Sequence, residues 1–202
     1  MPPTNPGLPA GKLPGELLGR LLSKIQRDDP RVVVGPGVGE DAAFLDFGDT
    51  LLVAKSDPVT FATDLAGWYT VQVNANDVAC CGAIPKWLLG TALLPVGTTP
   101  DEVELIFDQI AEACDALGIT MIGGHTEMTL DLPRPIISGT MLGEVEKGKE
   151  VMTAGARPGD RVILTKGIAI EGTSLLAREM RPQLKRAGVS ASVLDRAADY
   201  LY

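Results

Sequence analysis

The chain has 202 residues, of which 45% are hydrophobic and 22% charged, the composition of a folded globular protein. Its net charge is −8 and 4% of its residues are aromatic, so it lacks the basic surface and stacking side chains of nucleic-acid binders. No apolar run approaches the roughly 20 residues of a membrane span, and its three cysteines show no C-x-x-C spacing. We therefore expect a cytoplasmic protein that binds neither nucleic acid nor membrane.

The N-terminal part of the chain predicts a short helix, a strand and a hairpin. Residues 1–13 are rich in proline and glycine and predict a flexible segment. Leucines at helical spacing predict a helix over residues 14–25, and residues 31–34 predict a strand. After a glycine-rich turn come two apolar segments, residues 42–47 and 51–54, which predict a hairpin.

The central part predicts helices that alternate with strands. Residues 64–81 can form a helix, whose geometry places Asn74 and Asp77 on one face because they lie three residues apart. Residues 86–96 predict a strand. Residues 100–117 predict the clearest helix of the chain, with apolar side chains at helical spacing and a glycine directly after them.

Three further strands are expected towards the C-terminus. Residues 119–122 predict the first, which runs into a turn at Gly123-Gly124, and residues 134–145 and 161–165 predict the others. Because strands and helices interleave, the fold class is α+β or α/β, with a mixed sheet covered by helices. We expect a flexible segment, an N-terminal domain and the incomplete start of a second α/β domain, over residues 1–13, 14–155 and 156–202.

The two common glycine-rich phosphate motifs are missing. Gly35 and Gly37 begin a dinucleotide-type fingerprint, but Glu40 stands where that motif needs its third glycine. No G-x-x-x-x-G-K-[ST] sequence occurs either. Those two nucleotide-binding folds are therefore poor explanations of the chain.

Three aspartates at the edges of the expected elements are the candidate chemical groups. Asp41 follows the glycine-rich turn, Asp57 ends an apolar strand, and Asp77 lies in an otherwise apolar helix segment. Each alone is compatible with a turn or a helix cap, but a carboxylate among apolar groups needs a charge partner. Magnesium is one such partner, since it binds through a few carboxylates together with phosphate oxygens.

Four sequence blocks, taken together, carry a resemblance. They are Gly39-Glu-Asp-Ala-Ala43, Ser56-Asp57, Val73-Asn-Ala-Asn-Asp-Val-Ala79 with Gly82-Ala-Ile-Pro85, and Gly123-Gly-His-Thr-Glu127. In this order the chain resembles the aminoimidazole ribonucleotide (AIR) synthetase superfamily from about residue 11 to about residue 180. Hydrogenase maturation factors, thiamine monophosphate kinase, selenophosphate synthetase and formylglycinamidine synthase belong to it. The motifs are closest to those of AIR synthase-related and HypE-like hydrogenase maturation proteins.

The resemblance implies a PurM-like N-terminal domain that pairs with a second copy through its sheet and binds ATP near that interface. It implies that Asp41, Asp57 and Asp77 hold magnesium ions that bridge the phosphates. It implies a role in catalysis for Asp57, Asp77 and His125. It also implies a role in nucleotide binding for Asp41, Asn74, Gly123, Gly124, Thr126 and Glu127.

One position departs from part of the superfamily. Many members carry Gly-Gly-Asp-Thr where this chain has His125, so a carboxylate is lost there or supplied by Glu127. As the only histidine of the chain, His125 is a candidate base, with a structural or phosphate-contacting role as the alternative. Lys12 would close over phosphates if the N-terminal segment folds as a lid, and otherwise is a solvated lysine.

We therefore expect an ATP- and magnesium-dependent enzyme that phosphorylates a substrate oxygen and so activates it. The alternatives are a small-molecule kinase resembling thiamine monophosphate kinase and a non-catalytic dimeric module that binds nucleotide. Three separated aspartates favour catalysis. The substrate, small or protein-bound, sits between the two domains in this superfamily, so the sequence does not identify it.

Overall fold

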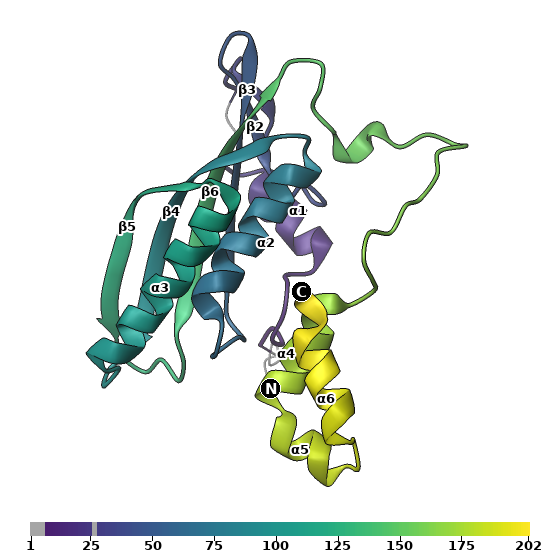
Figure 1. Cartoon of the computed structure of the whole chain (residues 1–202). Helices are drawn as coiled ribbons and strands as arrows, with labels where there is room; N and C mark the ends of the chain where they lie inside the picture. Colours follow the sequence, from purple (N-terminus) through teal and green to yellow (C-terminus); the bar gives the residue numbers. More distant parts are fainter. Residues whose placement is uncertain (1–6, 26–27) are drawn as a thin grey trace, which may run out of the picture.

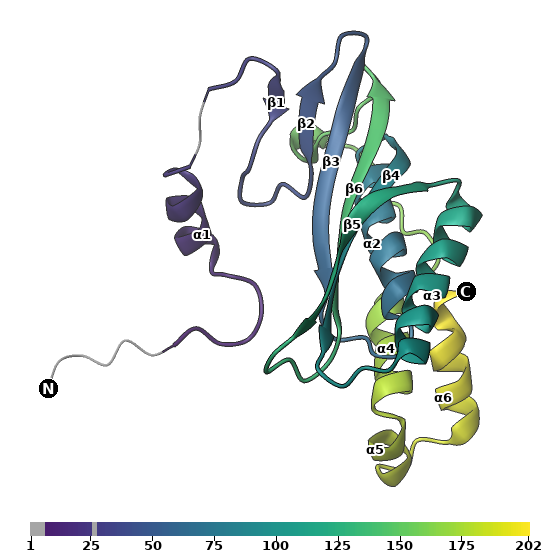
Figure 2. The ribbon, with the colours of Figure 1, turned by 90° about the vertical axis from the view of Figure 1, so that its left-hand side faces the viewer.

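The computed structural model describes residues 7–25 and 28–202. A six-stranded sheet forms its centre, and two long helices cover one face of that sheet (Figures 1 and 2). The strands are β1 Val32–Val34, β2 Ala43–Asp46, β3 Thr50–Val59, β4 Ile84–Pro95, β5 Thr120–Thr129 and β6 Ile136–Glu146. The helices are α1 Gly15–Leu22, α2 Ala66–Cys80, α3 Pro100–Leu117, α4 Ile170–Glu179, α5 Arg181–Arg186 and α6 Ala191–Ala198, with 3₁₀ turns η1 Thr153–Gly155 and η2 Asp199–Leu201.

The sheet is mixed, and its strand order is β1-β2-β3-β6-β4-β5. Strands β4 and β5 pair in parallel, and the other neighbouring pairs are antiparallel. The expected hairpin is the β2–β3 pair. The expectation of a mixed α+β sheet with flanking helices is confirmed. The flexible segment expected at residues 1–13 falls in part on residues 1–6, which lie outside the described residues.

The core lies between the sheet and the helices α2 and α3. Side chains alternate between the two faces along a strand, and in β6 every second residue is buried. Val71 and Val78 of α2 and Ile110 of α3 pack against Met141 and other buried residues of this face. The sequence places these apolar residues at the period of each element, so one hydrophobic layer forms between sheet and helices.

Helix α3 begins and ends where its sequence predicts. The Thr99 hydroxyl accepts a hydrogen bond from the backbone of Glu102, whose carboxylate accepts one from the backbone of Thr99. This reciprocal pair satisfies two of the free amides at the helix start. Gly118 ends the helix in the left-handed conformation, at φ 67°.

The expected turn at Gly123-Gly124 is wrong, because β5 continues through both glycines. Gly124 lies beside Gly90 of β4 in the parallel register. A Cβ atom on Gly124 would lie 1.8 Å from the carbonyl oxygen of Gly90. The absence of a side chain therefore serves the close approach of two strands at this point.

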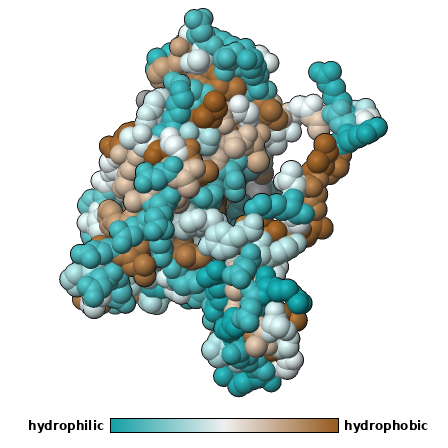
Figure 3. Space-filling view, viewed as in Figure 1, coloured by the Kyte–Doolittle hydropathy of each residue, from teal (hydrophilic) through white to brown (hydrophobic). Residues whose placement is uncertain are grey.

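The expected strand at residues 161–165 is also wrong, since this stretch has no regular secondary structure. It belongs to a long connection that runs from the top of the sheet to the C-terminal helices (Figure 1). Val162, Ile163 and Leu164 are largely exposed along it, and apolar side chains gather on this connection in the space-filling view (Figure 3). A strand needs a partner, and the described part of the chain supplies none here.

The C-terminal helices α4 to α6 form a small group of their own beside the first turn of α2 (Figure 2). The Glu179 carboxylate accepts hydrogen bonds from the backbone amide and the hydroxyl of Thr63, at 2.6 and 2.7 Å. Arg178 forms an ion pair with Asp64 at 2.9 Å.

Among the described residues, no helix has the length and apolar character to cross a membrane.

Candidate functional site

Three aspartates that are far apart in the sequence meet around one ammonium group. The Nζ atom of Lys55 lies 2.7 Å from a carboxylate oxygen of Asp77, 3.4 Å from one of Asp57 and 3.7 Å from one of Asp41. The Lys55 side chain is 8% exposed, whereas those of Asp77, Asp57 and Asp41 are 27%, 38% and 70% exposed. The cluster thus opens from a buried lysine towards solvent on its Asp41 side.

Strand and helix periodicity explain how the cluster forms. Lys55 and Asp57 lie two residues apart in β3, so both point to the helix-covered face of the sheet. Helix α2 crosses that face and brings Asp77 against Lys55. Asp41 arrives from the loop just before β2, the strand that pairs with β3.

The lysine stays charged in this environment. Burial alone lowers the pKa of Lys55, but the hydrogen bond to Asp77 and the charges of Asp77, Asp57 and Asp41 outweigh burial and raise that pKa above its ordinary value. The cluster therefore combines one ammonium with three acidic side chains.

Asn74 connects the helix to the strand that carries Asp57. Its side chain is completely buried, and its amide nitrogen donates to the backbone carbonyls of Asp57 and Thr70. A Cβ atom on Gly139 of β6 would lie 2.6 Å from this nitrogen, so a glycine is needed for the amide to reach the sheet. Asn74 and Asp77 share one face of α2, as their spacing predicts.

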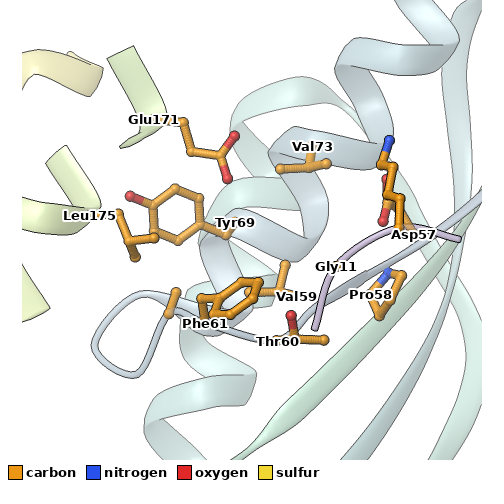
Figure 4. Close-up of a pocket in the computed structure, with 12 residues that line it drawn as sticks. Gly11, Asp57, Pro58, Val59, Thr60, Phe61, Tyr69, Val73, Glu171 and Leu175 are labelled. Carbon is orange, nitrogen blue, oxygen red and sulfur yellow. The ribbon is translucent and has the colours of Figure 1, made fainter. Parts of the chain in front are cut away.

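The cluster borders two cavities. The larger, of about 510 Å³, lies between the end of β3, the start of α2 and helix α4, with Asp57 at one end and Glu171 at the other (Figure 4). Gly11 and Lys12 of the N-terminal segment also line it. The smaller, of about 170 Å³, is lined by Asp41 and Asp77 together with neighbouring residues.

The segment around His125 lies elsewhere. His125 is beside Thr91 in the β4–β5 register, on the face of the sheet away from α2 and α3, whereas Asp57 and Asp77 lie on the helix-covered side. Its Nε2 atom is 3.1 Å from a carboxylate oxygen of Glu127, and both side chains are more than half exposed. The hydrogen bonds from His125 and Thr129 lower the pKa of Glu127. Within one chain, Gly123 to Glu127 therefore do not join the aspartate cluster.

The donor chemistry of the cluster suits a hard cation, because carboxylate oxygens are the ligands that magnesium prefers. Yet among residues 7–25 and 28–202, no three acidic, histidine or cysteine side chains are arranged to hold a metal by themselves. The three aspartates face an ammonium group instead. A metal at this place would need further oxygen ligands, such as those of a phosphate.

Sequence reasoning located the three aspartates but missed Lys55. A signal was present: a lysine two residues before an aspartate in an apolar strand shares its face and cannot remain buried without a counter-charge. The charge partner that Asp77 needs is thus supplied by the chain itself.

Comparison with known proteins identifies the family. Residues 39–145 match the model of the AIR synthase related protein, N-terminal domain. The chain belongs to this family. The match contains Asp41, Lys55, Asp57 and Asp77, so the AIR synthase related domain includes the entire cluster. It also includes strands β2 to β5 and all but the last residue of β6.

Relatives of this AIR synthase related chain include phosphate-transferring enzymes. Thiamine-monophosphate kinase of Bacillus subtilis is 33% identical over 119 residues, which cover 58% of this chain and 36% of that one. The structure of AaThiL complexed with AMPPCP and TMP superposes with a TM-score of 0.60 at 21% identity, over 91% of this chain and 60% of that chain. The structure of hydrogenase maturation protein HypE in complex with ATP superposes with a TM-score of 0.51 at 25% identity, over 65% of this chain and 40% of that chain.

These likenesses confirm the PurM-like fold and the resemblance to AIR synthase-related and HypE-like proteins. The chain spans about half or less of the length of the curated relatives it matches.

Proposed function

We propose that this chain is the nucleotide-binding domain of an ATP- and magnesium-dependent enzyme that phosphorylates a substrate oxygen to activate it. The observation that carries the proposal is the convergence of Asp41, Asp57 and Asp77 beside two cavities. One relative is named as a kinase and one related structure contains ATP, and both support the choice of ATP as the ligand.

The aspartates would hold magnesium together with the phosphates of the nucleotide. When bound, the metal supplies neutralisation of phosphate charge, which is the main requirement of phosphoryl transfer. The chain's own residues position the parts: Asn74 fixes the backbone of Asp57, and Lys12 lines the larger cavity from its N-terminal side. A carboxylate placed at the end of a rigid strand holds its ligand with little loss of conformational entropy.

We further propose a homodimer that forms through the sheet. Helices α2 and α3 cover one face of the sheet, whereas α1 stands apart from the other face (Figure 2), and that other face presents the partly exposed Leu89. Strand β5 is at the edge of the sheet and exposes nearly all of its residues. An uncovered apolar face with an open edge favours a protein partner.

The dimer gives the β5 residues their proposed role. Because His125, Thr126 and Glu127 lie far along the sheet from the aspartates, they would contact nucleotide in the site of the partner chain. Gly123 and Gly124 would contribute backbone at the same place. All three cysteines are free thiols, which supports a reducing, cytoplasmic setting.

Two alternatives remain distinct from this proposal. A small-molecule kinase resembling thiamine-monophosphate kinase is favoured by the 33% identity to that enzyme of Bacillus subtilis. A non-catalytic module would keep the cluster but bind nucleotide without turnover. Formation of ADP from ATP in the presence of candidate acceptors separates these two alternatives, because a kinase transfers the phosphoryl group to its acceptor and releases ADP, whereas a non-catalytic module forms none.

Calorimetry with ATP tests the proposal. We expect binding with magnesium and none in EDTA, because a cluster with three carboxylates repels bare phosphates. Asp57→Asn should weaken the binding of magnesium-ATP at least about tenfold, an effect of about 1.4 kcal/mol, while Asp49→Asn at the hairpin tip should leave it unchanged. Equal affinity with and without metal would refute the metal-bridged site.

A further inference from the structure

Lys55 occupies the place where the carboxylates of the cluster meet. Its ammonium lies within 3.7 Å of all three aspartates and is almost fully buried. An ammonium is a compact charge with three donors on a flexible four-carbon stem. It therefore satisfies the carboxylates in the way that a small cation would, but it belongs to the protein.

A divalent metal would need the same oxygens. Magnesium binds carboxylate oxygens at about 2.1 Å, so a metal bound to the facing oxygens of Asp77 and Asp57 would lie within a few ångströms of Nζ. Two like charges at that separation repel strongly in a partly buried site. The ammonium and a metal are thus competitors for one set of ligands.

We infer that Lys55 is a resident counter-cation that keeps free divalent metal out of the cluster until a phosphate arrives with it. The inference rests on the proposed function, in that a metal-bound phosphate is the ligand that completes the site. The phosphate supplies the metal with the oxygens that the protein lacks. It also offers the ammonium a new anionic partner when the carboxylates turn to the metal.

The surroundings of the cluster allow this exchange. Asp57 lines the larger cavity, whereas Asp41 and Asp77 line the smaller one, so a metal with its phosphate can reach the carboxylates around the ammonium from either cavity. Asp77 makes the short contact to Lys55, and Asp41 makes the longest and is the most exposed. The contact to Asp41 is therefore the weakest of the three, and the contact to Asp77 is the one that a metal must displace.

Binding of Mn²⁺ without nucleotide tests the inference. Manganese is followed by electron paramagnetic resonance on wild type, Lys55→Met and Lys55→Arg. We expect Lys55→Met to bind Mn²⁺ at least about tenfold more tightly than wild type, because a competing positive charge is gone. Lys55→Arg keeps the charge and should bind as weakly as wild type. Equal affinity of wild type and Lys55→Met would overturn the inference.

A second variant covers the case in which Lys55→Met does not fold because its three carboxylates repel one another. The double variant Asp41→Asn with Lys55→Met has the same net charge at the cluster as wild type. It should still bind Mn²⁺ more tightly, since two carboxylates then lack a competing ammonium. Affinity no higher than that of wild type would overturn the inference in this background as well.

The same titration in the presence of a non-hydrolysable ATP analogue separates this inference from the proposed function. We expect the analogue to raise the Mn²⁺ affinity of wild type more than that of Lys55→Met. If the analogue binds wild type with Mn²⁺ but raises both affinities equally, the role of Lys55 is refuted and the function stands. If the analogue does not bind at all, the proposed function fails, while the comparison without nucleotide still decides the role of Lys55.

Discussion

The side-chain amide of Asn74 donates a hydrogen bond to the backbone carbonyl of Asp57, 3.1 Å away. The same nitrogen donates to the carbonyl of Thr70 at 2.9 Å, so one buried amide joins α2 to the end of β3. Its Oδ1 atom has no hydrogen-bond partner within the described part of the chain. The position of Asp57 therefore depends on a helix residue that carries no charge.

Replacing Asn74 with alanine should affect both stability and the site. Loss of the amide removes two hydrogen bonds made by a fully buried side chain, which costs about 1–3 kcal/mol in the free energy of unfolding. We also expect weaker binding of magnesium-ATP, because Asp57 loses its tether. The matched control is Asn76→Ala on the exposed side of the same helix. Equal melting temperatures for Asn74→Ala and Asn76→Ala would contradict this role of Asn74.

Gly124→Ala separates a structural role of this glycine from a nucleotide contact. A Cβ atom there would meet the Gly90 carbonyl. We therefore expect the free energy of unfolding to fall by about 1–3 kcal/mol because of overpacking between β4 and β5. Gly155→Ala, in open space, should leave the melting temperature unchanged. If Gly124→Ala keeps full stability yet loses ATP binding, the glycine acts on nucleotide and the packing explanation is wrong.

The capping box of α3 predicts a pH-dependent contribution to stability. Hydrogen bonds from the backbone and hydroxyl of Thr99 lower the pKa of Glu102. A lowered carboxyl pKa stabilises the folded state above the unfolded pKa, and this stabilisation disappears as the pH falls through the folded pKa. Glu102→Gln should therefore be less stable than wild type at neutral pH and approach it in acid. Chemical denaturation from neutral to acidic pH measures the difference in the free energy of unfolding between Glu102→Gln and wild type, with Glu104→Gln as control. A difference that does not change with pH would show that the capping box is unimportant.

Thr99→Ala probes the other half of the same box. Removal of an N-cap hydroxyl costs about 1 kcal/mol, and the loss should not add fully to that of Glu102→Gln because the two side chains bond to each other. A double-mutant cycle measures this coupling. Strict additivity would show that the reciprocal bonds do not form in solution.

The proposed dimer can be tested by light scattering. Wild type should have the mass of two chains at micromolar concentration. Leu89→Arg places a charge on the uncovered face of the sheet and should give a folded monomer, whereas Leu117→Arg at the end of α3 should leave the dimer intact. A wild type that is monomeric under these conditions excludes pairing through the sheet.

Much of the fold follows from local patterns in the sequence. Helix α3 carries its own cap, its own apolar stripe and its own terminating glycine, so its bounds need no tertiary information. The hairpin of β2 and β3 is predictable for the same reason. In each case the residues that decide the structure are neighbours in the sequence.

The expectations that failed concern contacts between distant residues. The pair Gly123-Gly124 is typical of a turn, but Gly90, more than thirty residues away, determines that the chain stays extended there. The stretch of residues 161–165 has the composition of a strand, yet composition cannot supply a partner. Lys55 was missed because a counter-charge is a relation between side chains that only the folded chain brings together.

The exposed apolar connection has a consequence for the protein in concentrated solution. Val162, Ile163 and Leu164 combine strand-forming side chains with free backbone groups, which is a template for intermolecular pairing and aggregation. Two cations flank them: Arg161 on one side and Lys166 on the other, with Lys166 also bonded to the carbonyl of Leu201. Charges at the ends of such a stretch act as gatekeepers, so these two side chains oppose the association of chains through residues 162–164.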